Sequence, residues 1–252
     1  MAVYFVVSDV HSFYNEMIEA LDIAGFDPEN ETHIFVSLGD LFDRGPDSVK
    51  LLDFVNQLPD NRKILIKGNH EDLIEDALHR GYFRHHDWHN GTDKTIYQLS
   101  NVYDNDSIAI EKCKKNTALK QYLKSCINYY ETKNYVFVHG WIPTSDNWRN
   151  GDWKQARWKC CFDEWSKGNI IPDKIIVAGH WHTSYGHSKY HNNGPEWDDE
   201  WIKIFHDLHP KKKLSNTACF DIFKDNGILA MDACTVYSHK VNCLRLERME
   251  DV

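Results

Sequence analysis

Hydrophobic residues gather in five short runs along the chain, and each run has the length of a β-strand. The runs cover Val3–Val7, His33–Leu38, Lys63–Lys67, Tyr135–Val138 and Lys174–Ala178. They are rich in β-branched residues and almost continuously apolar, which is typical of strands buried on both faces of a sheet. We therefore predict sheet structure that is covered by other elements on both sides.

Apolar residues recur at helical spacing in three segments that alternate with the first strands. These segments run from Phe13 to Gly25, from Pro46 to Leu58 and from Leu73 to Gly81. Gly25 suits the end of the first of these helices, and Pro46 suits the beginning of the second. Strands that alternate with helices pair in parallel, so their carboxyl ends meet at one edge of the sheet, where ligands bind.

Aspartate, asparagine or histidine follows every one of the five apolar runs. A polar loop without a function would contain Ser, Thr, Lys and Glu as readily. Carboxylate, imidazole and amide groups without any thiolate suit Mn²⁺, Fe or Zn²⁺ and do not suit a cysteine-rich structural zinc site. We therefore predict that a metal centre forms where these residues converge. They are Asp9, His11, Asp40, Asn69, His139, His180 and His182.

Composition and charge narrow the class of protein. Of the 252 residues, 42% are hydrophobic and 27% are charged, which predicts one globular domain over residues 1–252. The formal net charge of −9 argues against nucleic acid as a partner, and Lys211–Lys213 is predicted to be a solvated loop. No apolar stretch is long enough to span a membrane, and the first residues lack the features of a signal peptide. Seven cysteines without a C-x-x-C pair predict reduced thiols in the cytoplasm.

Two further segments, around residues 83–131 and 141–165, lie between predicted strands and contain many aromatic or apolar residues. Residues 83–89, together with apolar residues at helical spacing from Leu119 to Tyr130, predict a small cap or insert around 83–131. Five tryptophans crowd residues 141–165. We expect a loop packed by its own aromatic side chains. The alternative is an aromatic wall beside the metals that is able to stack a base or phosphotyrosine. His187 and His191 are interpreted as loop residues.

Five motifs together resemble the calcineurin-like metallophosphoesterase superfamily. They are Asp9-x-His11, Gly39-Asp40-x-x-Asp43-Arg44-Gly45, Gly68-Asn69-His70-Glu71, Val138-His139-Gly140 and Gly179-His180-x-His182. The second and third are similar to the Ser/Thr phosphoprotein phosphatase branch, with its bacterial and phage members and the related dinucleoside tetraphosphatases. Residues 87–95 resemble a Trp-x-x-Asn-Gly segment of the bacterial members, and residues 231–247 resemble their closing hairpin. The resemblance implies an α/β fold, a four-layer α/β/β/α sandwich of two mixed sheets with a dimetal site at the strand carboxyl edges.

The resemblance also implies a ligand set for two divalent ions, with Mn²⁺ expected and Fe or Zn²⁺ as alternatives. Asp9, His11, Asp40 and His182 would hold one ion. Asp40 would bridge to a second ion held by the residues Asn69, His139 and His180. Two ions, two aspartates and a bridging hydroxide leave a net charge of +1 that attracts phosphate. Direct in-line attack by that hydroxide needs no phosphoenzyme.

Three residues are predicted to perform the remaining chemistry. The planar fork of Arg44 matches phosphate oxygens. His70 resembles the family's general acid for the leaving alkoxide, and Asp43 resembles the carboxylate that orients this histidine. Asn69 and His70 are expected to contact the substrate together with Arg44.

The chain departs from the Ser/Thr phosphatase pattern at two places. That branch usually lacks the second histidine of the Gly-His-x-His motif, whereas Trp181-His182 matches the wider superfamily and indicates a substrate outside phosphoproteins. The branch often has Trp-x-Arg after the fourth strand, which supplies a second phosphate arginine. This chain has Arg157 and Lys159 in that region as candidate replacements.

Together these patterns predict a dimetal phosphomonoesterase that acts on a phosphoprotein or a small phosphoester. A dinucleoside polyphosphate hydrolase and a nucleic-acid end phosphatase are the enzymatic alternatives. A non-catalytic, metal-stabilised binding module is the alternative from another class. Arg44, His70 and Asp43 discriminate against the binding module, because binding alone has no need of a proton donor.

Overall fold

The computed structural model describes residues 2–145, 147–196 and 218–247, which form two β-sheets flanked by helices. The strands are β1 (Val3–Val7), β2 (His33–Ser37), β3 (Lys63–Leu65), β4 (Tyr130–Glu131), β5 (Tyr135–Phe137), β6 (Ile175–Ala178), β7 (Phe223–Asp225), β8 (Ile228–Ala230) and β9 (Cys243–Glu247). All five apolar runs are therefore confirmed as strands. The first sheet has the order β3-β2-β1-β9, and the second has the order β4-β5-β6-β8-β7.

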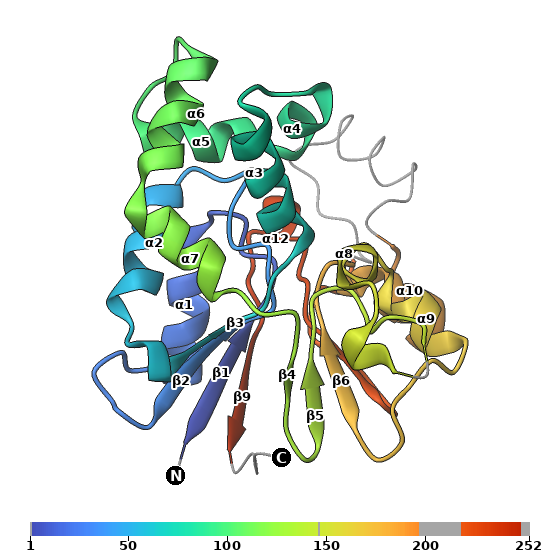
Figure 1. Cartoon of the computed structure of the whole chain (residues 1–252). Coiled ribbons are helices and arrows are strands. Elements are labelled where there is room, and N and C mark those ends of the chain that lie inside the picture. The colour runs from blue at the N-terminus through green and yellow to red at the C-terminus, as the bar shows by residue number, and fades with distance from the viewer. Residues whose placement is uncertain (1, 146, 197–217, 248–252) are drawn as a thin grey trace, which may run out of the picture.

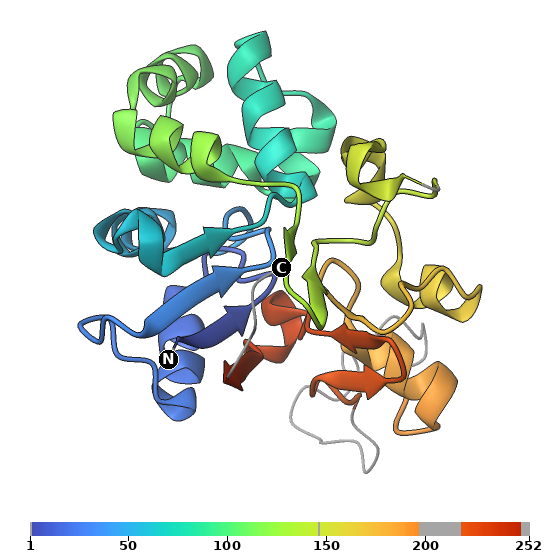
Figure 2. The same cartoon turned by 60° about the horizontal axis from the view of Figure 1, so that its bottom comes forward.

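Both sheets are mixed, as expected. In the first sheet β1 and β3 run parallel to β2, and β9 runs antiparallel to β1. In the second sheet β5, β6 and β8 are parallel, and β4 and β7 are antiparallel edge strands. Strands β1 and β9 come from opposite ends of the chain and lie side by side, in dark blue and dark red (Figure 2).

Helices connect the strands on both sides of the sheets. They are α1 (Tyr14–Ala24), α2 (Ser48–Gln57), α3 (Asn69–Arg80), α4 (His85–Asn90), α5 (Thr92–Ser100), α6 (Asp106–Lys115), α7 (Thr117–Ser125), α8 (Trp153–Ala156), α9 (Cys161–Ser166), α10 (Thr183–His191) and α12 (Thr235–Ser238). The three predicted helices are confirmed. Helix α2 begins two residues after Pro46, with Asp47 at its N-cap position, and α1 ends at Gly25, whose φ of +84° only glycine adopts without cost.

The alternation of side chains along the strands creates the layers. Tyr4 and Val6 of β1 join Val36, Phe137 and Val177 in a core between the two sheets. Their neighbours on β1, Phe5 and Val7, point to the other face and pack in a core with α1 and α2. Successive strand residues point to opposite faces, so a strand buried on both faces is apolar throughout.

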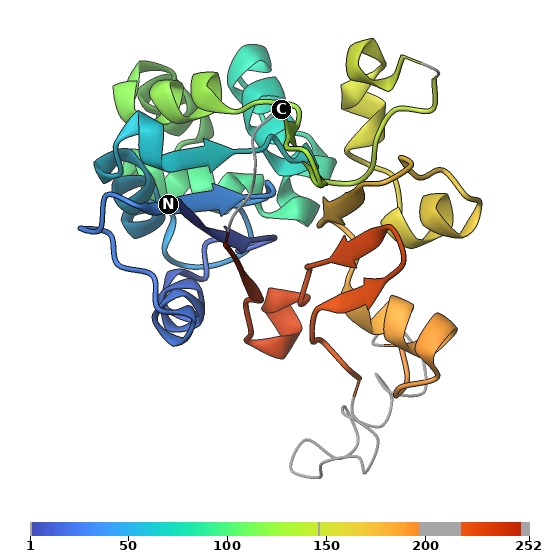
Figure 3. The same ribbon diagram turned by 90° about the horizontal axis from the view of Figure 1, so that it is seen from below.

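The second sheet follows the same rule. Val136 and Ile176 face away from the first sheet and pack against the tryptophan-rich segment that contains α8 and α9. The two sheets thus lie between two sets of helices, with α1, α2 and α7 on one side and α8, α9 and α10 on the other (Figure 1, Figure 3). This arrangement is the four-layer sandwich expected from the sequence.

Residues 83–131, where a cap or insert is predicted, contain the four helices α4–α7. Ile96, Ile110 and Leu119 from these helices share one buried cluster with Phe5 and Val7 of β1. The helical spacing read from Leu119 to Tyr130 extends too far, because α7 ends at Ser125. The chain then runs beside β3, where the Ile127 amide donates to the Leu65 carbonyl at 2.8 Å.

The predicted hairpin at residues 231–247 and the predicted loop at His187 and His191 are both wrong. Residues 231–247 do not form a hairpin, because they cross from β8 in the second sheet through α12 to β9 in the first. A hairpin lies just before this segment instead, where β7 and β8 turn at Asn226-Gly227. His187 and His191 lie on α10 and pack on Phe223, so they are not loop residues. Lys211–Lys213 lies outside the described residues.

All seven cysteines are free thiols. Within residues 2–145, 147–196 and 218–247, no helix combines the length and the apolar character that a membrane span requires.

Candidate metal centre

The loops beyond the strand ends interlock and bring distant motifs together. The Asp9 amide donates to the Gly39 carbonyl at 3.3 Å, and the Gly179 amide donates to the His139 carbonyl at 2.7 Å. The loops of the two sheets are also connected, because the His180 amide donates to both carboxylate oxygens of Asp9, at 3.0 and 3.2 Å. The predicted convergence of these loops at one edge therefore occurs.

Two motif glycines permit this close approach. A Cβ atom at Gly68 would collide with the Asp40 carboxylate, and a Cβ atom at Gly179 would collide with the side chains of Ser8 and Asp9. Any larger residue at either position would push the loops of neighbouring strands apart. The glycines of the Gly-Asn-His and Gly-His motifs are thus explained by space around the carboxylates.

The same loops concentrate an uncommon backbone conformation. Seven non-glycine residues of the motif loops have positive φ values, between 49° and 75°. They are Asp9, His11, Ser12, Asp40, Asp43, Arg44 and His180. Aspartate and histidine tolerate this region better than most residues, but Arg44 and Ser12 do not, and such strain clusters at functional sites. The fold thus maintains these loops at a cost in stability, which indicates a functional constraint.

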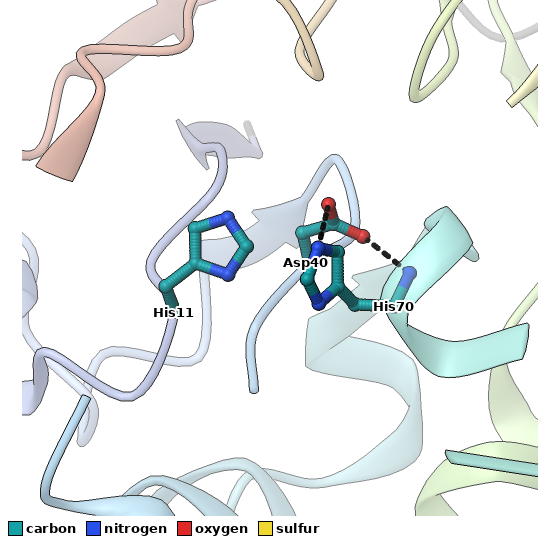
Figure 4. A group of neighbouring side chains, drawn as sticks. All are labelled: His11, Asp40 and His70. Carbon is teal, nitrogen blue, oxygen red and sulfur yellow. Dashed lines mark hydrogen bonds and ion pairs between the residues drawn. The ribbon is translucent and has the colours of Figure 1, made fainter. Parts of the chain in front are cut away.

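Two groups of side chains could each hold a metal ion, and Asp40 belongs to both. The first contains His11, Asp40 and His70 (Figure 4), and the second contains Asp40, His139 and His180. Within each group one ligand atom per residue lies within 4.8 Å of the others. Asn69 adds an amide oxygen to the second group, at 2.8 Å from His139 Nε2.

The orientation of two histidines fits metal binding. His11 Nδ1 donates to the Phe42 carbonyl at 3.0 Å, and His139 Nδ1 donates to the Leu38 carbonyl at 2.8 Å. A carbonyl only accepts, so Nδ1 carries a proton in both histidines, and Nε2 faces the centre. Metal-ligating histidines usually have such a partner on the far nitrogen. Together with the oxygen and nitrogen donors of both groups, this arrangement fits two divalent ions.

Histidines of both groups favour an ionised Asp40. Burial by itself would raise the pKa of this carboxyl, but the adjacent His139 and His70 outweigh burial and hold it well below its usual range. Burial works against a charged His139, whereas the Asp40 carboxylate raises its pKa to about 10. His180 is affected in the opposite direction, because burial and the neighbouring His139 lower its pKa to about 3.

Asp9 and His182 belong to neither group among the residues that the structure describes. The Asp9 carboxylate accepts from the Ser8 hydroxyl and from the His180 amide. His182 Nδ1 lies 2.8 Å from the Ser184 hydroxyl. The structure therefore brings five of the seven predicted ligands into direct proximity and places these two beside them with other partners.

Asp232 is a buried carboxylate that the sequence interpretation missed. Burial raises its pKa, and its charge in turn helps to raise the pKa of Asp9. Its neighbour in space is the His182 loop, since the Thr183 amide donates to the Asp232 carbonyl at 2.8 Å. The signal for it was present, because Asp232 directly follows the apolar residues 228–231, as the other acidic residues follow their strands.

Arg44, His70 and Asp43 form a connected chain of hydrogen bonds. Arg44 Nη1 lies 3.1 Å from His11 Nε2, and Nη2 lies 3.2 Å from His70 Nε2. A guanidinium only donates, so His70 Nε2 accepts and its proton lies on Nδ1, which donates to Asp43 Oδ2 at 2.7 Å. The structure thus brings the three residues together in the arrangement expected of an acid, its orienting carboxylate and a phosphate-binding arginine.

Glu71, the last residue of the third motif, holds the loops after β2 and β3 together by hydrogen bonds. Its carboxylate accepts from the backbone amides of Gly68, Asp40 and Leu41, at 2.8, 3.0 and 3.1 Å, and from the Tyr122 hydroxyl at 2.7 Å. Burial, followed by the nearby Asp40 carboxylate, raises the pKa of Glu71. This side chain therefore joins the second and third motifs.

The two candidate replacements for a second phosphate arginine are engaged elsewhere. Arg157 is buried and donates to the Lys67 carbonyl, to Asp72 and to Asn128. Lys159 donates to the Ile142 carbonyl, to Thr144 and to Glu164. Neither cation has the freedom to contact a phosphate at the centre without breaking these bonds.

The tryptophan-rich segment mostly packs on itself, as expected. Trp141, Trp148 and Trp153 are buried in the core on the outer face of the second sheet. Trp158 differs, because it is 43% exposed and its ring centroid lies 5.9 Å from that of His180. One aromatic ring of the segment thus lies beside the candidate metal centre.

Known proteins share parts of this sequence. Segments of 79 and 81 residues are 39% and 42% identical to symmetrical bis(5'-nucleosyl)-tetraphosphatases of Edwardsiella ictaluri and Psychromonas ingrahamii, covering 31% and 32% of this chain. A segment of 72 residues is 37% identical to serine/threonine-protein phosphatase 1 of Salmonella typhimurium, covering 29% of this chain. The matched segments span only 27%, 28% and 31% of these three relatives.

Solved structures share the fold over nearly the whole chain. A putative diadenosine tetraphosphatase superposes with a TM-score of 0.55 at 14% identity, covering 97% of this chain and 89% of its own. A cold-active protein-tyrosine phosphatase of a Shewanella species gives 0.52 at 19% identity, covering 98% and 76%. The sequence profile of the calcineurin-like phosphoesterases matches residues 3–220. The chain therefore belongs to the calcineurin-like phosphoesterase family.

Proposed function

We propose that this protein hydrolyses phosphate monoesters at a centre of two divalent ions, with Mn²⁺ as the expected metal. The observation that carries the proposal is Asp40, which is common to both groups of metal donors and lies next to the connected Arg44, His70 and Asp43. When bound, two such ions supply positive charge for the phosphate and acidify water. The set Asp9, His11, Asp40 and His182 and the set Asp40, Asn69, His139 and His180 are the proposed ligands.

The protein's own side chains bind the phosphate and handle the proton of the leaving group. Arg44 extends its guanidinium over the first group, where it can turn from the two histidines to the phosphate oxygens. Asn69 and His70 line the same space. When Arg44 turns to the phosphate, His70 Nε2 is free to take up a proton, and Asp43 stabilises the orientation and charge of the resulting imidazolium. His70 then transfers this proton from Nε2 to the leaving oxygen.

The second candidate is hydrolysis of a dinucleoside polyphosphate at the same centre. The exposed ring of Trp158, 5.9 Å from His180, favours it, because an indole face next to the centre can stack a nucleobase. The ring of His86 on α4 also lies near this indole, at 6.1 Å between centroids. The tetraphosphatase names of two relatives agree with this candidate. The net charge of −9 argues against a nucleic-acid end as the substrate.

A substrate panel tests the proposal. It contains p-nitrophenyl phosphate, a phosphoserine peptide, a phosphotyrosine peptide, diadenosine tetraphosphate and a 5'-phosphorylated oligonucleotide, each with Mn²⁺ and with EDTA. We expect release of inorganic phosphate from monoesters with Mn²⁺ and none with EDTA. Cleavage of diadenosine tetraphosphate alone would establish the second candidate. Activity that EDTA leaves unchanged would contradict both.

The two histidines of the Gly-His-Trp-His motif should respond differently to substitution. His180→Ala removes a donor from the group that contains Asp40 and His139, so we expect loss of one ion and of activity at every Mn²⁺ concentration. His182→Ala leaves Asp9, His11 and Asp40, and three protein ligands can still hold a divalent ion. We therefore expect weaker metal binding, with partial activity restored at high Mn²⁺.

The measurement is activity against Mn²⁺ concentration for both variants, with anomalous scattering to locate each ion. His191→Ala is a matched control, since this histidine lies at the far end of α10 from the centre. An unchanged Mn²⁺ requirement in His182→Ala, with both ions in place, would show that His182 is no ligand and would agree with its position outside both donor groups.

A further inference from the structure

The Asp43 carboxylate receives hydrogen bonds on both of its oxygens. Oδ2 accepts from His70 Nδ1 at 2.7 Å and from the Thr92 hydroxyl at 2.8 Å, and Oδ1 accepts from the Thr95 hydroxyl at 2.7 Å. Asp43 and both threonines are fully buried. A carboxylate with one partner can rotate about its Cβ–Cγ bond, whereas donors on both oxygens fix its plane.

Helix α5 supplies both hydroxyls from its first turn. Thr92 and Thr95 are three positions apart, so they lie on the same face of the helix. The Asp43 amide donates to the Thr95 oxygen at 2.8 Å, which closes the contact from the other side. Gly91 precedes the helix, and a Cβ atom there would collide with the Arg44 backbone. The segment 87–95 thus places the start of α5 directly against the Asp43–Arg44 loop.

We propose that Thr92 and Thr95 are positioning residues for the proton donor of the reaction. This inference rests on the proposed function of His70 and assigns a role to the 87–95 segment. The two hydroxyls hold Oδ2 of Asp43 toward His70 Nδ1. His70 Nε2 is thereby kept facing Arg44 and Asp40, at 3.2 and 3.8 Å. The threonines act only through Asp43 and touch no substrate.

Substitution of one hydroxyl by a methyl group tests this role. Thr95→Val keeps the shape of the side chain and removes its donor, and Thr95→Ser keeps the donor. We expect Thr95→Val to lower kcat for phenyl phosphate on the order of tenfold. The loss should be clearly smaller for p-nitrophenyl phosphate, whose leaving group needs little protonation. Thr95→Ser should restore both rates, and Thr95→Val should cause no further loss in the His70→Asn background.

A spectroscopic measurement separates this proposal from the proposed function. With ¹⁵N-labelled histidine, the proton on His70 Nδ1 is assigned by its disappearance in His70→Asn. We expect a protected signal in the wild type and in Thr95→Ser, and a broadened one in Thr95→Val. A wild-type protein that hydrolyses none of the phosphoesters would overturn the proposed function, while this signal would still decide whether the threonine positions His70.

Thr132→Val is the matched control, since Thr132 is also buried and its hydroxyl oxygen accepts from the Tyr135 amide at 3.0 Å, at the β4–β5 turn. It should lower stability without changing the ratio of the two rates. Thr92→Val repeats the test if Thr95→Val fails to fold. An unchanged His70 signal in the folded valine variant, or an equal loss for both substrates, would overturn the positioning role.

Discussion

Replacing Asp40 by asparagine should lower activity by several orders of magnitude and remove metal from both sites. Asp40 is the one side chain common to the two donor groups, and it lies 3.3 Å from His139 and 3.8 Å from His70. Asparagine has the same shape and can still accept the His70 amide proton that Asp40 Oδ1 accepts at 2.9 Å. It lacks the negative charge that attracts divalent ions, so the effect isolates that charge.

The measurement combines phosphate release with metal content by mass spectrometry of the purified protein. Asp53→Asn, an exposed position on α2, removes the same charge from the surface and should change neither quantity. The bridging assignment would be wrong if the Asp40→Asn protein retained two tightly bound ions and a rate near that of the wild type.

His70→Asn should lower kcat by about 10²-fold or more while the metal content stays near that of the wild type. Asparagine fits the same space but cannot donate a proton as an acid. The loss should decrease as the leaving group improves, from a phosphoserine peptide to p-nitrophenyl phosphate, because a stable leaving anion needs no proton. A kcat series over aryl phosphates measures this dependence.

The position of His70 also allows a role as a metal ligand, and the same experiment distinguishes this role from that of an acid. His70 belongs to the first group of donors with His11 and Asp40, so a ligand role predicts the loss of one ion in the variant. An equal loss of rate for every leaving group, accompanied by loss of metal, would replace the acid role with a ligand role. His79→Asn, an exposed position on the same helix α3, is the control.

Local patterns were sufficient to predict the strands β1, β2, β3, β5 and β6 and most of the residues that the structure brings together at the candidate centre. Asp9, Asp40, Asn69 and His139 follow their strands within two to four residues, so the parallel arrangement within each sheet brings them to the carboxyl ends of the strands. The strands β1 and β6 are apolar throughout because both of their faces are buried, and this pattern is visible in a single sequence. The apolar pattern predicted sheets covered on both faces, and the four-layer sandwich itself was implied by the resemblance to the metallophosphoesterases.

Contacts between distant segments could not be predicted in this way. Thr92 and Thr95 bond to Asp43 across about 50 residues, and no periodicity or spacing links them. The same holds for β9, whose partner is β1. Where local spacing competes with tertiary contacts, the contacts prevail, and residues after Ser125 leave the helical pattern to pair with β3. Asp232 was missed although it follows the same rule as the other acidic residues.

The pairing of β1 with β9 constrains the order of events during synthesis. Val3 pairs with Glu247, so the strand that leads to Asp9 and His11 gains this neighbour only when almost the whole described chain has left the ribosome. Until then one edge of β1 is open, and an open edge can recruit other chains. Contacts this distant in sequence also close slowly. A nascent chain should therefore complete the first sheet only after β9 has emerged, so the open edge of β1 persists while most of the described residues are synthesised.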